Sequence, residues 1–505
     1  MTLRICDILG RIYSGPHEVT IEISLNATVC LQIVQSSEAE KGIVKTQDRG
    51  KVGTKRSSSY KHKFKVEIPA NQLTGKIAAA LLLAGSFLFA GGLVNSASAT
   101  GTGEIWLSST NSLNYLGLQT NFGSGTLQDP YYGDFDYIFG YLVTSNTVVH
   151  LGNGNFWTKS FSPSGGYSVI AIPSGVTIQG EGQAFTTIKR SQIYTNVDLA
   201  VLYSTNSGIS VRDLTVDCNG SDYALNSWSN AVMGILLRGS YETVEHVTII
   251  NGLGFQFAPE GFQMIIGSLG EGGNKVIGCT TSNFLGTYGD GVQTEGDCVV
   301  EGNSFYFPVE PAGIPYRPMF GINVAASGNG TTVVGNYVYG GGDGVHNDTG
   351  GDNNVVIANN VFENVCTGVY LTGDKGPYES IIISHNLMTQ VTNYPSYQDQ
   401  RFMVCIGTKY AGETNRNIIV DGNIIRYYQN VPVASDGVQG AIYIYGGANQ
   451  LNENVSIINN QIDARMPIGF TGNFSNFYAS GNIPLNGTNF ASNGNPSLTN
   501  FVPDP

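Results

Sequence analysis

Apolar and polar residues alternate in short runs that repeat along the chain from about Gly234 onward. Each unit has a glycine-led apolar run, a polar turn, and a second apolar run that ends near an asparagine. Examples are GVQTEGDCVVEGNSF at 291–305 and GINVAASGNGTTVVGNYV at 321–338. Such units cannot bury their apolar faces alone and must stack on one another. The repeat therefore predicts a solenoid.

The spacing inside each run is that of a β-strand. Val369 and Leu371 fall on one side and Tyr370 and Thr372 on the other, as in a strand with one buried face. No segment of the repeat has helical spacing, and the LxxLxL core of leucine-rich repeats is missing. The glycines that open successive runs are 30, 23 and 24 residues apart, at Gly291, Gly321, Gly344 and Gly368. We therefore predict an all-β, single-domain parallel β-solenoid.

An asparagine recurs at the end of the second run of each unit. An asparagine at a repeated turn can adopt left-handed backbone geometry, and its amide can bond to the amide one rung above. We interpret these residues as a structural ladder, formed by Asn303, Asn336, Asn360, Asn386, Asn423, Asn460 and Asn482.

Three segments that precede the repeat carry a family resemblance. TVVHLGNGNFW at Thr147–Trp157, VTIQGEGQAFTTI at Val176–Ile188 and SVRDLTVDCNG at Ser210–Gly220 resemble the first coils of the pectin-lyase-like superfamily. The resemblance covers about residues 140–490 and implies a right-handed parallel β-helix. It also implies an N-terminal cap at 100–145, with a short amphipathic helix at Asp134–Leu142, a β-helix at 146–490 and a tail at 491–505.

Members of this superfamily include pectate and pectin lyases, polygalacturonases, alginate epimerases, phage tailspikes and adhesins. The polygalacturonase motifs NTD, GDD, GHG and RIK and the epimerase DPH signature are absent, and Arg317-Pro318 has only half of the RxPxxR segment of pectate lyases. The resemblance thus implies the fold and a carbohydrate substrate, without a particular reaction.

The charge of the chain is divided unevenly. Residues 1–99 hold 12 Lys or Arg and 7 Asp or Glu, which leaves 13 basic and 31 acidic residues, or 13 − 31 = −18, in 100–505. This net negative charge disfavours nucleic acid and anionic membranes as partners. It also makes polyanionic sugars awkward substrates, so a neutral or cationic glycan is easier to bind.

Lys76, the apolar run Ile77–Val94 and Ala97-Ser98-Ala99 follow the order of a secretory signal. We expect cleavage after Ala99 and a secreted or cell-surface protein with no membrane contact afterwards; a membrane anchor is the alternative. Residues 1–75 precede this signal at 76–99, and we interpret them as an unassigned extension that reflects an over-extended gene start.

The five cysteines after Ala99 have no regular spacing, so we expect buried residues in the coils, with one bridge between neighbouring rungs as an option. No zinc-type pairing occurs. A calcium site at Asp297, Asp352 and Asp374 has no fixed ligand spacing to support it. No cofactor is therefore predicted, and the oligomeric state is left open.

Counting alternate positions from the interior residues of each first run gives two outward columns. The first is Leu236, Gln293, Asn323, His346, Tyr370 and Tyr443, and the second is Arg238, Glu295, Ala325, Asp348, Thr372 and Tyr445, with Lys409 added from the neighbouring run. Tyrosine rings and amides along a shallow groove suit sugar rings. We predict a substrate-binding role for Gln293, Asn323, Tyr370, Tyr443, Tyr445, Arg238 and Lys409; an ordinary polar surface is the alternative.

Glu295 and Asp348 are predicted to lie two rungs apart, with backbones roughly 9.6 Å from each other at about 4.8 Å per strand. Such a separation suits inverting glycoside hydrolysis, in which one carboxyl is the acid and the other the base. We therefore name Glu295, Asp348 and His346 as candidate catalytic residues, with His346 as a proton relay. Asp290 and Asp343 open two matched GDGV segments, and their repetition favours a role in turns.

The sequence thus predicts a secreted polysaccharide-active protein, a glycoside hydrolase or polysaccharide lyase that acts on an extended glycan. The alternative is a non-catalytic β-helix that binds glycans or serves as a surface or adhesion protein. The enzyme needs titratable groups that converge, whereas the binding protein needs only the tyrosines and amides.

Overall fold

The computed structural model describes 24 stretches of the chain, and the account below is confined to them. They are residues 18–24, 28–34, 62–67, 103–109, 123–133, 135–158, 172–190, 199–220, 232–252, 261–262, 264–267, 272–283, 289–307, 319–325, 330–347, 351, 353–373, 376–390, 402–408, 414–426, 441–446, 450–464, 468–485 and 498–499.

The chain divides into two compact units, Met1–Ser98 and Ala99–Pro505. In the first, β1 (Glu18–Ser24) pairs antiparallel with β2 (Thr28–Val34) and with β3 (His62–Glu67). The predicted signal at 76–99 lies outside the described residues. Among the residues that the structure describes, no helix is long and apolar enough to cross a membrane.

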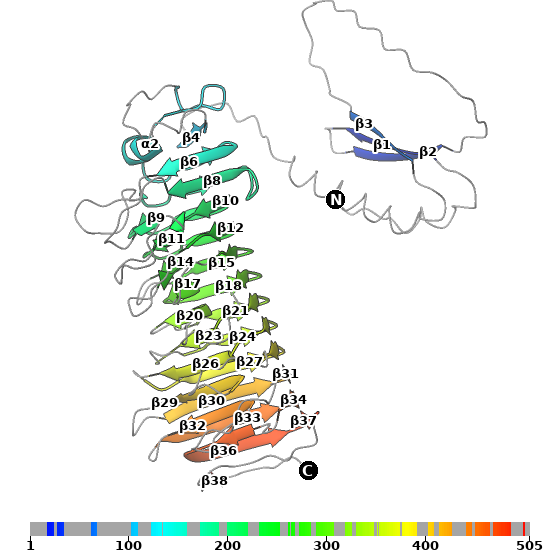
Figure 1. Cartoon of the computed structure of the whole chain (residues 1–505), viewed down its shortest axis with the longest axis vertical. Coiled ribbons are helices and arrows are strands. Elements are labelled where there is room, and N and C mark those ends of the chain that lie inside the picture. The colour runs from blue at the N-terminus through cyan, green and yellow to red at the C-terminus, as the bar shows by residue number, and fades with distance from the viewer. Residues whose placement is uncertain are drawn as a thin grey trace, which may run out of the picture. The chain divides into compact units, whose positions relative to one another are not determined.

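The second unit is a parallel β-solenoid, as the repeat predicts. One rung consists of β17 (Gly289–Glu295), β18 (Cys298–Glu301) and β19 (Ser304–Tyr306), and each strand pairs in parallel with its equivalents in the rungs on either side. Figure 1 shows these strands stacked in rows along the unit. The sequence predicts two strands per unit, and the structure adds a third strand of two or three residues after each ladder asparagine.

Strands in equivalent positions form three rows. The first row, here called the first sheet, contains β9 (Leu199–Ser204), β11 (Val232–Leu237), β14 (Met264–Gly267), β17, β20 (Met319–Ala325), β23 (Asp343–Asn347), β26 (Thr367–Gly373), β29 (Val404–Thr408), β32 (Ile442–Gly446) and β35 (Ile468–Phe470), with β13 (Gly261–Phe262) beside β17.

The second row contains β4 (Glu104–Leu107), β5 (Val148–Leu151), β7 (Thr177–Gln179), β10 (Ser210–Asp217), β12 (Thr243–Ile250), β15 (Asn274–Ile277), β18, β21 (Thr332–Val334), β24 (Val356–Ala358), β27 (Glu379–Ser384), β30 (Thr414–Asp421), β33 (Leu451–Ile458), β36 (Asn473–Ser480) and β38 (Leu498–Thr499). The third contains β6 (Gly154–Thr158), β8 (Thr186–Arg190), the ends of β10 and β12, β16 (Thr280–Ser282), β19, β22 (Tyr337–Tyr339), β25 (Val361–Glu363), β28 (Leu387–Thr389), β31 (Ile424–Arg426), β34 (Gln461–Asp463) and β37 (Ile483–Pro484).

A short helix, α2 (Phe135–Tyr141), lies at the start of this unit, where the sequence predicted a capping helix at 134–142. Its Phe135 and Phe139 are buried, and the Phe135 ring lies 5.8 Å from the ring of Phe156 in β6. The helix therefore packs its apolar side against the first rungs.

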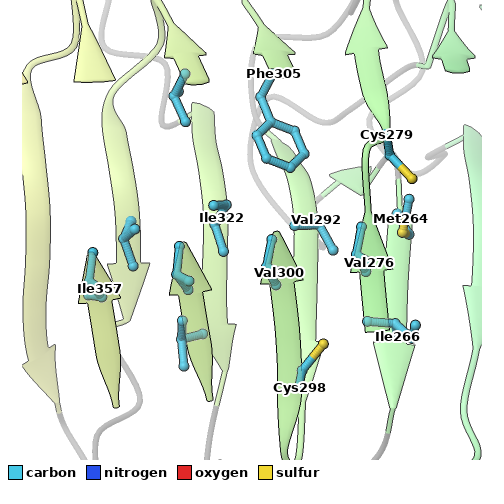
Figure 2. Close-up of a cluster of buried hydrophobic side chains, with 14 of the residues drawn as sticks. Met264, Ile266, Val276, Cys279, Val292, Cys298, Val300, Phe305, Ile322 and Ile357 are labelled. Atoms are coloured by element: carbon cyan, nitrogen blue, oxygen red, sulfur yellow. The ribbon is translucent and has the colours of Figure 1, made fainter. Parts of the chain in front are cut away.

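The interior of the solenoid is a continuous apolar core. Val292 and Ile322 of the first sheet and Val300 and Phe305 of the other two rows are fully buried and face the same interior (Figure 2). Each rung places such side chains above those of the next, so the buried core becomes longer with each added rung and does not become wider.

The repeated glycines are explained by this core. A Cβ at Gly291 would lie 2.4 Å from the Phe305 ring, and a Cβ at Gly344 would lie 2.4 Å from the Phe362 ring. The interior rings of the third strand therefore press against the Cα atoms at the start of the first strand. A larger residue there would displace a buried aromatic side chain.

The asparagine ladder is confirmed. The side chain of Asn360 donates to Asn386 Oδ1 at 2.9 Å, and its own Oδ1 accepts from the side chain and the backbone N–H of Asn336 at 2.9 Å each. The left-handed residue is the one before the ladder position, for example Asn359 at φ 56° and His385 at φ 55°. The ladder asparagines thus bond along the axis while their neighbours turn the chain.

Five cysteines of the second unit, Cys218, Cys279, Cys298, Cys366 and Cys405, are buried and form no disulfide. Cys218, Cys279 and Cys298 belong to the interior core, as expected, and no bridge joins neighbouring rungs at these positions. Cys405 instead packs with Phe402 and Tyr443 in a separate apolar cluster.

Glu242 is a carboxyl inside the wall between β11 and β12, with no exposed surface. Its Oε2 accepts from the backbone N–H of Ile209 at 3.1 Å, and its own N–H donates to Asn274 Oδ1 at 2.9 Å. Its Oε1 has no hydrogen-bond partner among the described residues. Burial raises the pKa of the Glu242 carboxyl to about 8, so it is mainly protonated at neutral pH.

The ladder predicts a specific loss of stability. Asn360→Ala removes one buried amide and takes away the acceptor of the backbone and side-chain N–H groups of Asn336, so the free energy of unfolding should fall by about 1–3 kcal/mol. The midpoint of urea unfolding measures this. Asn153→Ala, at an exposed position, is the control and should leave the midpoint nearly unchanged. Equal midpoints for both variants would contradict a stabilising ladder.

Glu242 predicts a dependence of stability on pH. Between the unfolded pKa of about 4.5 and the folded pKa of about 8, only the folded state holds the proton. The free energy of unfolding therefore falls as pH rises through this window, by up to about 1.4 kcal/mol per pH unit. Glu242→Gln should remove this contribution, so urea midpoints of the wild type should decline relative to the variant.

The control is Glu301→Gln, at an exposed carboxyl of β18. A difference between wild type and Glu242→Gln that stays constant across the window would mean that Glu242 is not protonated in the folded state.

Candidate functional site

The outer face of the first sheet carries the predicted column in register. Successive parallel pairs join the residues Tyr203, Leu236, Ile265, Gln293, Asn323, His346, Tyr370, Cys405, Tyr443 and Gly469. The order proposed for Gln293, Asn323, His346 and Tyr370 is therefore found on adjacent strands. Ile265 and Cys405 also belong to the column, which the sequence alone did not show.

A second outward column lies three residues earlier in each strand. Asp290 pairs with Phe320, and Phe320 pairs with Asp343. The sequence favoured turns for these two aspartates, but both lie inside strands, at the beginning of β17 and β23. The glycine after each aspartate faces the interior and so does the valine after it, which brings Asp290 and Gln293 to the same outer face.

The aspartates bond to the residues of the predicted column. Asn323 donates through Nδ2 to Asp290 Oδ2 at 2.9 Å, and His346 Nδ1 lies 2.6 Å from Asp343 Oδ2. Both carboxyl groups belong to residues with no exposed surface, and Asn323 and His346 are 3% and 4% exposed. Burying such polar groups costs free energy unless hydrogen bonds compensate for it. These four residues, Asp290, Asn323, Asp343 and His346, are here called the polar cluster, and they are as buried as residues of the interior core.

Rings fix the orientation of the imidazole. The His346 ring stacks on the Phe320 ring, with centroids 3.7 Å apart and planes within 3°, and on the Tyr370 ring at 5.3 Å and 12°. Tyr443 likewise stacks on Phe402 at 4.4 Å. At least one face of each tyrosine ring is therefore occupied by a neighbour, which restricts the stacking on sugar rings that the sequence suggested for Tyr370 and Tyr443.

Glu295, at the end of β17, is held by two side chains. Its Oε2 forms an ion pair with Arg238, and its Oε1 accepts from Gln293 Nε2 at 2.7 Å. The Glu295 side chain is 13% exposed and that of Arg238 is 34% exposed, so this carboxylate reaches solvent while Asp290 and Asp343 do not. Of the residues placed in the second predicted column, Glu295 pairs with Ala325 of β20 as expected.

Two other predicted site residues, Asp348 and Lys409, lie outside the described residues. For Tyr445 the structure gives the backbone register, opposite Gly407 of β29, and nothing of its side chain. The strands β17 and β23 are separated by β20 alone, which is the two-strand separation assumed for Glu295 and Asp348. The geometry of that carboxyl pair stays a prediction.

Apolar clusters lie on the outer face on both sides of the polar cluster. Ala200, Met233, Leu236 and Ile265 of β9, β11 and β14 form one, with Tyr203 packed against it. Phe402, Cys405 and Tyr443 form the other, with Tyr370 packed against it. Among the described residues of this face, the charged side chains lie on β17, on β23 and at Arg238, directly after β11.

The arrangement offers acid, base and hydrogen-bonding groups. Among the described residues, no group of three or more His, Cys, Asp or Glu side chains is placed to hold a metal ion. Sequence reasoning missed Asp290, Asp343 and Phe320 as members of this site. The signal was the repeated GDG at 289–291 and 342–344, because an aspartate before a glycine that must face the core points outward.

The β-helix unit is similar to known structures. No family model matches the sequence, and no curated protein matches it. The crystal structure of the Dettilon tailspike protein aligns with a TM-score of 0.50 at 14% identity, over 68% of this chain and 62% of the tailspike. The chain therefore spans less than two thirds of that protein. The β-helix unit of this chain therefore has the fold of a right-handed parallel β-helix.

Two further structures align at lower scores. The Family 28 exopolygalacturonase of Yersinia enterocolitica gives a TM-score of 0.44 at 12% identity, over 70% of this chain and 72% of that one. The surface protein and adhesin PfbA of Streptococcus pneumoniae gives 0.36 at 11% identity, over 70% and 88%. At such identities the likeness concerns the β-helix fold alone.

Proposed function

We propose that this β-helix protein is a glycoside hydrolase whose site lies on the outer face of β17, β20 and β23. The observation that carries the proposal is the polar cluster itself. It consists of Asp290, Asn323, Asp343 and His346, which are almost fully shielded from solvent. The strands on either side of it carry apolar clusters on the same outer face. Titratable groups in such surroundings are more frequent at functional sites than elsewhere.

In the proposed reaction, Glu295 and Asp348 act as the two carboxyl groups. One gives its proton to the glycosidic oxygen, the bond from that oxygen to the anomeric carbon breaks, and water adds to the carbon from the opposite face. The other carboxylate takes the proton released by the water. Strands two apart lie roughly 9.6 Å from each other, at the upper end of the separation that leaves room for this water.

His346 and the binding residues complete the proposed site. The Asp343–His346 hydrogen bond and the flanking rings support a role for His346 in moving or orienting a proton beside the reacting carboxyl groups. Substrate hydroxyls are proposed to bind Gln293, Asn323 and Arg238, and also Tyr370, Tyr443, Tyr445 and Lys409.

Hydrolysis is favoured over elimination by the charges on this face. Elimination at a uronate unit requires a cation that neutralises the sugar carboxylate. Of the described residues at the site, Arg238 carries a permanent positive charge and is paired with Glu295. A neutral or cationic glycan avoids this requirement and suits the charge of −18 carried by residues 100–505 (13 − 31).

A binding protein without catalysis is the second candidate, and one observation favours it. Both carboxylate oxygens of Glu295 are engaged, by Arg238 and Gln293, as in a structural ion pair. Under this alternative the polar cluster orders the face on which a glycan rests, and no bond is broken.

We further propose that the protein works outside the cytoplasm, as secreted or surface-bound, because the signal-like order at 76–99 precedes the β-helix unit. The mass or N-terminal sequence of the protein recovered from the medium tests this. A mature chain that begins near Thr100 supports it, and recovery in the cytosol at full length contradicts it.

Substitutions of the carboxyl groups test the proposed reaction. Glu295→Gln and Asp348→Asn should each lower kcat on a cleaved glycan by about 10²–10⁴-fold, because each removes a proton donor or acceptor while keeping the shape of the side chain. The control is Glu453→Gln, because Glu453 is also paired with an arginine, Arg416, but lies on β33 in another row. Full activity of either site variant would rule out this assignment.

A panel of polymers tests the substrate. We expect the release of reducing ends from a neutral or cationic polymer, such as linear glucans, xylan, mannan or chitosan, without the absorbance of an unsaturated product. Faster cleavage of polygalacturonate or alginate would contradict the charge argument, and unsaturated products would indicate elimination. Binding to a polymer without cleavage would favour the second candidate.

A further inference from the structure

Tyr241 is a bulky residue at a turn position that the other rungs give to small or turn-forming residues. It lies between β11 and β12, and its backbone has φ 59°, in the left-handed region. In the rung of β17 the left-handed residue is Gly296. The residues that match Tyr241 in register and in the sign of φ are Asn146, Gly175, Gly208, Gly273, Gly330, Asn354, Ser380, Asn417, Asn454 and Asn476.

The left-handed conformation is unfavourable for a tyrosine. The Cβ of a bulky residue crowds the following carbonyl oxygen in this geometry, whereas glycine has no Cβ and asparagine can bond locally. Burial does not compensate for this strain, because Tyr241 is 73% exposed, more than any other large apolar or aromatic residue that the structure describes. A strained and exposed side chain that interrupts a repeat points to a function of that side chain.

The Tyr241 ring lies on the backbone of the next rung. A Cβ at Gly273, the equivalent residue there, would be 2.5 Å from Cδ1 and 2.8 Å from Cε1 of the ring. Gly273 therefore leaves room for the ring, which rests on backbone while most of its surface faces solvent. A tyrosine held in this way presents carbon surface and a hydroxyl group on the outside of the coil.

Hydrogen bonds to both neighbouring rungs hold the backbone of this turn. The N–H of Tyr241 donates to the carbonyl of Gly272 at 2.9 Å. On the other side, the Ser240 carbonyl accepts from the N–H of Gly208 at 2.8 Å, and the N–H of Ser240 donates to Ser207 Oγ at 3.1 Å. A ring on a backbone that is fixed beforehand loses less conformational entropy when a ligand binds.

Charged groups with solvent access lie near the ring. Arg238 precedes Tyr241 by three residues, is 34% exposed and pairs with Glu295. Asp297, which is also exposed, is two rungs on in the same turn position, and its Oδ2 lies 3.5 Å from the place that a Cβ at Gly272 would take. A glycan that rests on the ring would therefore meet both donors and acceptors for its hydroxyl groups.

We infer that Tyr241 is a sugar-stacking residue, on which one sugar ring of a neutral glycan lies with its apolar face, beside Arg238 and Glu295. This inference rests on the proposed function only in taking a glycan as the ligand, and it applies equally to a hydrolase and to a binding protein. It adds a contact in the turn after the first sheet, where neither neighbouring rung has an aromatic side chain at the equivalent position.

Tyr241→Asn separates a binding role from a structural one. Asparagine occupies equivalent turns, as at Asn354 and Asn417, so the urea midpoint should stay the same or rise. The Kd of the full chain for the polymer of the panel that it retains most strongly in native gels should increase about tenfold, because the stacked ring is lost. On a polymer that is cleaved, KM should rise by a similar factor while kcat changes little.

Two variants serve as controls. Tyr241→Phe keeps the ring and should bind almost as the wild type does. Tyr478→Asn makes the same change at another exposed tyrosine, on β36 of the second row, and should leave Kd and KM unchanged.

The remaining outcomes count against the inference in distinguishable ways. Wild-type affinity in Tyr241→Asn would overturn it and leave the proposed function standing. A lower urea midpoint in Tyr241→Asn would also overturn it, because the ring would then contribute to the stability of the coil. If the wild type neither binds nor cleaves any polymer of the panel, both the inference and the proposed function are removed.

Discussion

In-register stacking of equivalent positions is the constraint on which the rest of the structure depends. Each strand of the first sheet pairs in parallel with the next, so that a side chain lies beside its equivalent on the neighbouring rung. Buried amides enforce this register, because a ladder asparagine such as Asn360 finds its partners only if the rungs align. The core and the outer face inherit the same order.

Much of the fold follows from local chemistry and was therefore accessible from the sequence. The column through Gln293, Asn323 and His346 could be predicted, because alternation about Val292 and its equivalents has a period of two residues. The third strand could not be, because three residues such as Ser304–Tyr306 are too few for a periodic signal. The position of the left-handed residue was also missed, because Asn359 and the ladder residue Asn360 are adjacent asparagines and either can adopt that geometry.

The buried half of the site was missed for a different reason. Asp290 and Asp343 stand before glycines, a context typical of turns. Their place in strands is imposed by a distant contact, the pressure of Phe305 and Phe362 on those glycines, which shifts the alternation by one residue. Such a tertiary cause leaves only an indirect trace in the sequence, the repetition of GDG. Glu295 and Arg238 could be placed on the outer face because each has the outward phase of its strand, but nothing local in the sequence indicates that they form an ion pair.

Stacking also explains how a site can form on one layer of strands. Inside the coil, the amide ladder fixes side chains by repetition; outside, Phe320, His346 and Tyr370 form a ladder of rings by the same geometry. Asp343 then fixes the remaining freedom of the imidazole by a hydrogen bond from its own strand. The positions of the polar groups are therefore set by the neighbouring rungs, and a rigid backbone below them keeps that order when a single outward residue changes. A site of this kind can change its chemistry through outward residues while the interior, which carries the stability, stays the same.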